Sequence, residues 1–236
     1  MRRAALVALA LAPALAGCQS TQERSAELER AAHRARKSTV AASGLRITRP
    51  STQVRVLAQT FLHGSEGAAG VVTVRNDLAL GLRAVPIAIE AKNASGAVVA
   101  SNTGPGLAAS LTIISYLAPH ATFTWVDDQL QGASASSLSA KVGEAATVTG
   151  PAPTLAVSGV HTFEDPANGP GAEGQVANRS SIEQHELAVY AVARRGSAVV
   201  AAGRAVIPVL APGQSAHFQA YFVGSPQGAT IEVQAP

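Results

Sequence analysis

The sequence has few of the residues that usually build large binding interiors and catalytic centres. Aromatic residues make up 4% of its 236 residues, charged residues make up 14%, and there is one cysteine. Because 47% of the residues are hydrophobic, the chain can still bury a core, which excludes wholesale disorder. The hydrophobic residues are mostly Ala and Val, which suit small β-sheet cores better than a large ligand-binding interior.

The sequence also lacks a basic region in its main body. The formal net charge is +3, but from residue 38 onward there are 11 Lys and Arg against 12 Asp and Glu. A near-neutral body offers no basic face to attract phosphates, so we expect no nucleic-acid partner. The basic residues that precede residue 38 are better suited to a modest attraction to anionic membrane headgroups.

The first 17 residues have the pattern of an export signal. Met1-Arg2-Arg3 is positively charged, and the apolar run 4–16 is too short to span about 30 Å of hydrocarbon. The run ends in Leu-Ala-Gly followed by Cys18, which resembles a bacterial lipoprotein signal with its lipobox. The resemblance implies cleavage before Cys18 and a thioether link from its sulfur to diacylglycerol. The alternative is a plain secretory signal with a chance cysteine.

Lipidation of Cys18 would make the membrane the first partner of the chain. One acyl chain binds a bilayer only marginally, whereas two or more chains, palmitate among them, would give a stable anchor. Since Cys18 is the sole cysteine, no disulfide is expected. Gln19 stands where the family's inner-membrane retention signal has Asp. We therefore expect the outer membrane in a two-membrane cell, or the outer face of the cytoplasmic membrane in a one-membrane cell.

Residues 18–49 are predicted to form the lipidated N-terminus and a short helical or flexible stalk. The segment 19–38 is polar and helix-prone, and Ser20 with Glu23 fits a capping box. One reading is a coiled-coil or partner-docking helix. The favoured reading is a solvated spacer, because isolated helices of this length are marginal in water.

The remaining chain contains an internal repeat, with copies at 50–147 and 154–236 joined by a linker at 148–153. Each copy carries a Val-x-Asn, an apolar alternating run, a Gly turn, a Val-Val pair and a Leu-x-Pro before an aromatic strand. The first copy also carries an insertion of about eight residues around Ser101–Ser110. Five matched features in one order are hard to produce by chance.

The segments of each copy have the pattern of short β-strands. They are 4–8 residues of period-two alternation bounded by Gly, Pro, Asn or Ser, and we count about seven per copy. This predicts an all-β protein with two tandem immunoglobulin-like β-sandwich domains. The repeated pattern resembles the FxLYD-type domains of bacterial envelope proteins. That resemblance implies a β-sandwich with no catalytic centre, so no functional residue is carried over from it.

No set of residues in the sequence predicts a catalytic, cofactor or metal site. No two of the six His lie within five residues of each other, so there is no local metal motif. Three weaker features remain, and each is more simply read as structural. These are His161 with Glu164 and Asp165 in a predicted Pro/Gly-rich loop, the adjacent Asp127 and Asp128 at a predicted strand end, and the glycines at positions 64, 67 and 70, which predict a flexible loop between strands.

Three aromatic residues, Trp125, Tyr221 and Phe222, are the best candidates for a binding face. Strand alternation places at least one of Tyr221 and Phe222 in the core, so core packing is the favoured reading. The sequence therefore predicts a non-enzymatic, membrane-anchored envelope lipoprotein that binds a protein or cell-wall partner. The alternative is a carbohydrate- or small-ligand-binding envelope lipoprotein that uses Trp125 and the insertion.

Overall fold

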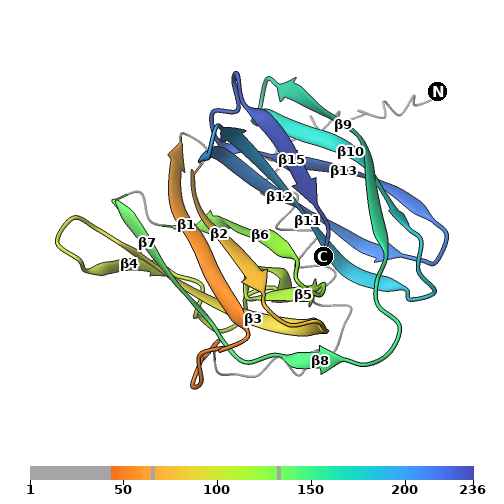
Figure 1. Cartoon of the computed structure of the whole chain (residues 1–236). Helices are drawn as coiled ribbons and strands as arrows, with labels where there is room; N and C mark the ends of the chain where they lie inside the picture. The colour runs from red at the N-terminus through yellow and green to blue at the C-terminus, as the bar shows by residue number, and fades with distance from the viewer. Residues whose placement is uncertain (1–43, 65–66, 132–133) are drawn as a thin grey trace, which may run out of the picture.

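The computed structural model describes residues 44–64, 67–131 and 134–236 (Figure 1). The export signal, Cys18 and most of the stalk lie outside the described residues. Within them the chain forms fifteen β-strands and one 3-10 helix, η1 (Ala109–Leu111). None of the helices in this part of the chain is long and apolar enough to cross a membrane. The prediction of an all-β protein is confirmed.

The strands of the first repeat form two antiparallel sheets. One has the order β1-β2-β6; in the other, β5 and β8 flank the first part of the long strand β3, and β4 and β7 flank its second part. The eight strands are β1 (Val54–Gly64), β2 (Gly67–Asn76), β3 (Gly81–Lys92), β4 (Val98–Ser101), β5 (Ile113–Leu117), β6 (Thr122–Leu130), β7 (Ser137–Val142) and β8 (Ala146–Val148).

The strands of the second repeat also form two antiparallel sheets, of orders β9-β10-β13 and β14-β12-β11-β15. Apart from the short β14, each strand matches one or two strands of the first repeat in the same order. The seven strands are β9 (Leu155–Asp165), β10 (Gly169–Asn178), β11 (Gln184–Arg195), β12 (Ala198–Leu210), β13 (Ser215–Tyr221), β14 (Val223–Gly224) and β15 (Thr230–Gln234).

The Val-x-Asn motif has the same structural role in both repeats. Asn76 is fully buried, its amide donates to the carbonyls of Leu80 (2.8 Å) and Ala118 (3.0 Å), and its oxygen accepts from the Leu78 amide. Asn178 is likewise buried and donates to Ile182 (2.7 Å) and Leu210 (3.0 Å).

The Gly turns match as well, because Gly96 and Gly196 both have positive φ, at 82° and 62°. The predicted Gly turn of each copy is therefore present in the structure.

The two repeats differ where the insertion falls. In the second repeat β12 runs alongside β11 for thirteen residues, whereas the matching strand of the first repeat is interrupted between β4 and β5. Asn102 fills the gap: its oxygen accepts from the Ile89 amide, and its nitrogen donates to the Ile87 carbonyl, both at 2.8 Å. One side chain thus takes the place of a backbone residue in the ladder, and the chain bulges out after it until the Thr112 carbonyl accepts a hydrogen bond from the Ile87 amide at 2.8 Å.

The four sheets are stacked as layers. The sheet β1-β2-β6 lies between the β3 sheet and the sheet that contains β11 and β12 (Figure 1). Strand β11 is buried on both faces: Leu187, Val189 and Ala191 point into the second repeat, while Tyr190 and Val192 pack into the core of the first. The repeats are therefore joined by a hydrophobic contact in addition to the linker.

Candidate functional site

The contact between the repeats, which we call the seam, is organised around Ser110 at the end of the insertion. The Ser110 carbonyl accepts hydrogen bonds from Trp125 Nε1 of β6 (3.0 Å) and from the Tyr190 hydroxyl of β11 (3.2 Å). Its hydroxyl accepts one from Arg204 Nη1 of β12 (2.7 Å). A single residue of the insertion thus connects both repeats, so the insertion is part of the seam.

A buried ion pair crosses the seam beside Ser110. Arg204 Nε lies 3.3 Å from Asp128 Oδ1, and the side chains are 2% and 16% exposed. The backbone amide of Arg204 also donates to Asp128 Oδ2 at 3.0 Å. A buried charge is costly when it has no partner, so each of these two groups depends on the other repeat for its neutralisation.

Aromatic residues fill the rest of the seam. Phe123 and Tyr190 meet edge to face, with ring centroids 5.4 Å apart. Tyr190 is 1% exposed, and this burial raises the pKa of its phenol far above the usual value. At the edge, Thr124 accepts from Arg194 through its hydroxyl and donates its amide to Gln234 Oε1. The seam combines an apolar centre with satisfied polar groups, as stable protein interfaces do.

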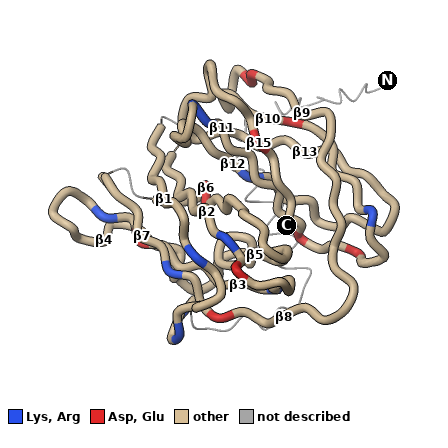
Figure 2. The backbone as a smooth tube through the Cα atoms, viewed as in Figure 1, with Lys and Arg blue, Asp and Glu red and all other residues tan. Residues whose placement is uncertain are grey.

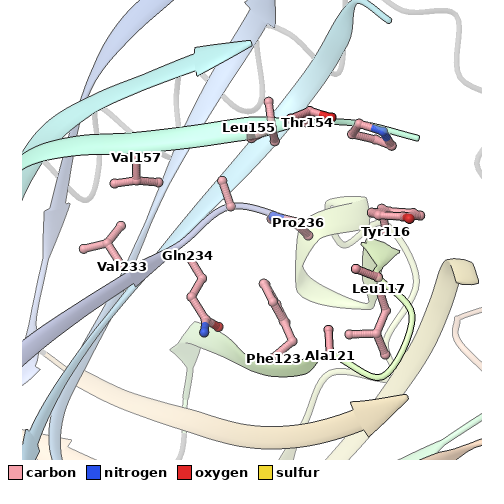
Figure 3. Close-up of a pocket in the computed structure, with 13 residues that line it drawn as sticks. Tyr116, Leu117, Ala121, Phe123, Thr154, Leu155, Val157, Val233, Gln234 and Pro236 are labelled. Carbon is pink, nitrogen blue, oxygen red and sulfur yellow. The ribbon is translucent and has the colours of Figure 1, made fainter. Parts of the chain in front are cut away.

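A hollow of about 570 Å³ opens next to the seam (Figure 3). We call it the notch. It is shared by the β5–β6 region of the first repeat and by the start and end of the second. Its walls are formed by Tyr116, Leu117, Ala118, Ala121, Phe123, Pro153, Thr154, Leu155, Val157, Val233, Gln234, Ala235 and Pro236.

The side chains that line the notch are neutral. Among the described residues, no Asp, Glu, Lys, Arg or His contributes to it, and Tyr116, Thr154 and Gln234 supply its polar side chains. The volume lies in the range of small-molecule sites, and the wall combines apolar side chains with hydrogen-bonding groups. The notch can hold an apolar group and orient it by hydrogen bonds from these polar side chains.

The structure brings one predicted histidine into a cluster, with different partners from those expected. His161 lies in β9, and its Nε2 is 2.8 Å from Glu173 Oε1 of β10, rather than beside Glu164 or Asp165. His217 of β13 and Gln219 contact the other oxygen of Glu173, at 3.4 and 2.8 Å. The prediction of a loop was wrong because the Pro/Gly-rich segment continues the β9–β10 hairpin.

The pKa values of His161 and Glu173 in this cluster are shifted by their contacts. The hydrogen bond to the Gly159 carbonyl and the contact with Glu173 raise the pKa of His161. The hydrogen bond from Gln219 and the contact with His161 lower the pKa of Glu173. Within the described residues, no group of three His, Cys, Asp or Glu side chains could hold a metal ion.

The other predicted positions are structural. Trp125 is fully buried at the seam, which confirms core packing and leaves no indole face for a sugar. Phe222 is buried and Tyr221 is half-exposed, as alternation predicted. Asp127 and Asp128 lie within β6 rather than at its end.

The glycine-rich loop was predicted wrongly. Gly64 ends β1, Gly67 begins β2, and Gly70 lies inside β2. Glycine is favoured at position 70 because a Cβ there would come within 2.7 Å of Ile89 Cδ1.

Sequence reasoning missed the seam and the notch. A signal was present in the run 187–193, where seven consecutive residues of β11 are buried. Such a continuous apolar run indicates a strand covered on both faces. The sequence does not say which surface covers the second face.

Comparison with protein-family models finds no match for the chain, and no curated protein matches it either. The resemblance to lipoprotein signals and to FxLYD-type domains therefore stays a prediction from the residues.

Proposed function

We propose that the protein is a non-enzymatic, lipid-anchored envelope protein whose two immunoglobulin-like sandwiches act as one rigid module for a protein or cell-wall partner. One sheet of each repeat is built in the same way: β1, β2 and β6 form it in the first repeat, and β9, β10 and β13 form it in the second. The remaining strands of each repeat form its other sheet. This division supports an immunoglobulin-like sandwich that lacks its last strand. The signal that ends at Cys18 supports export and anchoring.

The observation that carries the binding role is the notch between the repeats. It is built from residues of both repeats, and the Arg204–Asp128 and Ser110 contacts hold its two sides in register. A site held by rigid elements loses little entropy when a ligand binds. A wall of neutral side chains that combines apolar and polar groups favours a partner segment with apolar side chains and neutral polar groups.

Photo-crosslinking in cells tests the binding role. A photoreactive phenylalanine analogue at Tyr116, which lines the notch, should capture a discrete partner. The same analogue at the neighbouring exposed position Ser115, which is not part of the wall, should capture much less. Filling the notch with Ala121→Trp should abolish capture from Tyr116 while the far-ultraviolet circular dichroism stays β-type. Equal labelling from both positions would count against the notch as the site.

The anchor is tested separately. In the proposed function, Cys18→Ser removes the acyl mass from the mature protein and releases it from the membrane fraction. An unchanged mass and unchanged partitioning would refute the anchor without touching the notch.

A further inference from the structure

The two outermost sheets of the stack carry opposite charge. The outer sheet of the first repeat holds Arg83, Lys92 and Lys141 against a single carboxylate, Glu90. The outer sheet of the second repeat, β9-β10-β13, contains no Lys or Arg and carries Glu164, Asp165 and Glu173. Figure 2 shows the contrast, with red but no blue along β9, β10 and β13. The molecule is therefore polarised along the stacking direction. The expectation that a near-neutral body has no basic face was wrong, because the total charge cancels over the two ends of the stack.

The chain enters the body at the basic end. The segment 44–50 runs over the outer face of the β3 sheet, where Pro50 forms a bridge with Gly143 and Arg49 Nε lies 3.1 Å from Glu144 Oε2. Ile47 lies beside Gly143, so a Cβ on that glycine would be 3.3 Å from it. This segment adds Arg46 and Arg49 to the charge of the same face.

Part of this positive charge is left without an internal partner. Arg49 pairs with Glu144, and Lys92 pairs with Glu90. Arg46, Arg83 and Lys141 are exposed and form no ion pair with any described residue. Three free cations on one face, next to the point where the chain arrives from its N-terminus, suit a flat anionic surface.

We propose that this basic face, defined by Arg46, Arg83 and Lys141, rests on the anionic headgroups of the bilayer that holds the anchor. The proposal rests on the proposed lipid anchor. Each basic residue close to an anionic bilayer strengthens the attraction by roughly fivefold, and the attraction fades beyond a Debye length of about 10 Å at 0.1 M salt. The first repeat then faces the membrane, and the acidic sheet of the second repeat faces away from it, repelled by the same surface.

Energy transfer to labelled headgroups tests this orientation in the full lipidated chain. It is reconstituted into vesicles of phosphatidylcholine alone, or of an equal mixture with phosphatidylglycerol. Because Cys18 is acylated in the proposed protein, a new cysteine can take the donor dye. Ser137→Cys places it on the basic sheet, and Ser215→Cys places it on the acidic sheet. We expect transfer from position 137 to exceed that from position 215 in the anionic vesicles, and the difference to shrink at high salt.

Charge reversal provides the matched control. Arg83→Glu with Lys141→Glu should reduce the difference to the value seen in phosphatidylcholine, whereas Arg179→Glu with Arg195→Glu, exposed in the second repeat, should preserve it. Equal transfer from both positions in anionic vesicles, or a difference that survives the first reversal, would overturn the orientation. Failure of the chain to sediment with either vesicle would instead overturn the anchor. A difference that appears only with a cell-wall polymer or a protein added would assign the basic face to that partner and also overturn the proposal.

Discussion

Arg204 of the second repeat and Asp128 of the first are joined twice, once through the guanidinium and once through the Arg204 backbone amide. The Arg204 side chain is almost fully buried, although it sits on the outer face of its own sheet. In an isolated second repeat Arg204 would face solvent. In the whole protein it is buried between the two repeats. The repeats are therefore coupled through a charge that neither could bury alone.

Removal of this cation should weaken the whole molecule. Arg204→Met leaves Asp128 partly buried without its main cation, and the loss of one partner of a buried pair costs about 3 kcal/mol of unfolding free energy. Urea unfolding followed by the fluorescence of Trp125, the sole tryptophan, measures the change. Arg55→Met serves as the control, since the Arg55–Asp77 pair is exposed and should contribute much less. Equal losses in the two variants would argue against a buried seam.

The two buried asparagines should be the costliest polar positions of each repeat. Asn76→Ala and Asn178→Ala each leave several buried backbone groups without a partner, at about 2–4 kcal/mol. Asn93→Ala, in an exposed turn whose oxygen accepts from Ser95 and Ala97, should cost about 1 kcal/mol or less. Chemical denaturation of the three variants gives the comparison, and similar values for all of them would contradict the capping role.

Tyr190 should make stability sensitive to alkaline pH. Its pKa is raised in the folded protein, so above pH 10 the unfolded chain loses this proton while the folded chain keeps it. The stabilisation is complete below the unfolded-state pKa of about 10 and is lost as the pH rises beyond it. Tyr190→Phe should cost about 1 kcal/mol at neutral pH for the lost hydrogen bond to Ser110, and should flatten the alkaline decline. Urea midpoints between pH 8 and 11 measure both effects; an unchanged alkaline slope would mean that the phenol ionises in the folded state.

The His161–Glu173 contact should be visible by nuclear magnetic resonance. The imidazole of His161 should titrate above its ordinary pKa, and Glu173→Gln should lower that pKa by removing the carboxylate 2.8 Å away. Part of the elevation should remain, since the Gly159 carbonyl contributes most to it. Glu164→Gln, a neighbouring carboxylate that does not contact this imidazole, should leave the His161 titration in place. If both variants lowered the His161 pKa equally, the elevation would come from the surrounding negative charge in general and not from the contact with Glu173.

The strands and turns could be predicted because local chemistry specifies them. Period-two alternation, the Asn at the ends of β2 and β10, and the Gly turns each act over a few residues, and their recurrence strengthened the reading. The insertion was also visible from the sequence, because one copy is longer than the other.

The seam and the notch depend on contacts that no local pattern encodes. Nothing near Ser110 indicates that it bonds to Tyr190, eighty residues away, or to Arg204. Likewise, His161 meets Glu173 across a hairpin whose register includes a bulge, and spacing along the chain favoured Glu164 and Asp165 instead. Long-range pairing decides these positions.

Because the face of β11 and β12 that packs on the first repeat is apolar around Arg204, we do not expect either repeat to be well behaved on its own. If residues 154–236 were produced alone, Ala188, Tyr190 and Val192 would lose their contacts with the first repeat, and an apolar sheet face would be exposed to water. Such fragments should self-associate. Binding assays on a single repeat would then report nonspecific hydrophobic association instead of binding to the native surface. Any dissection of this protein has to keep both halves on one chain.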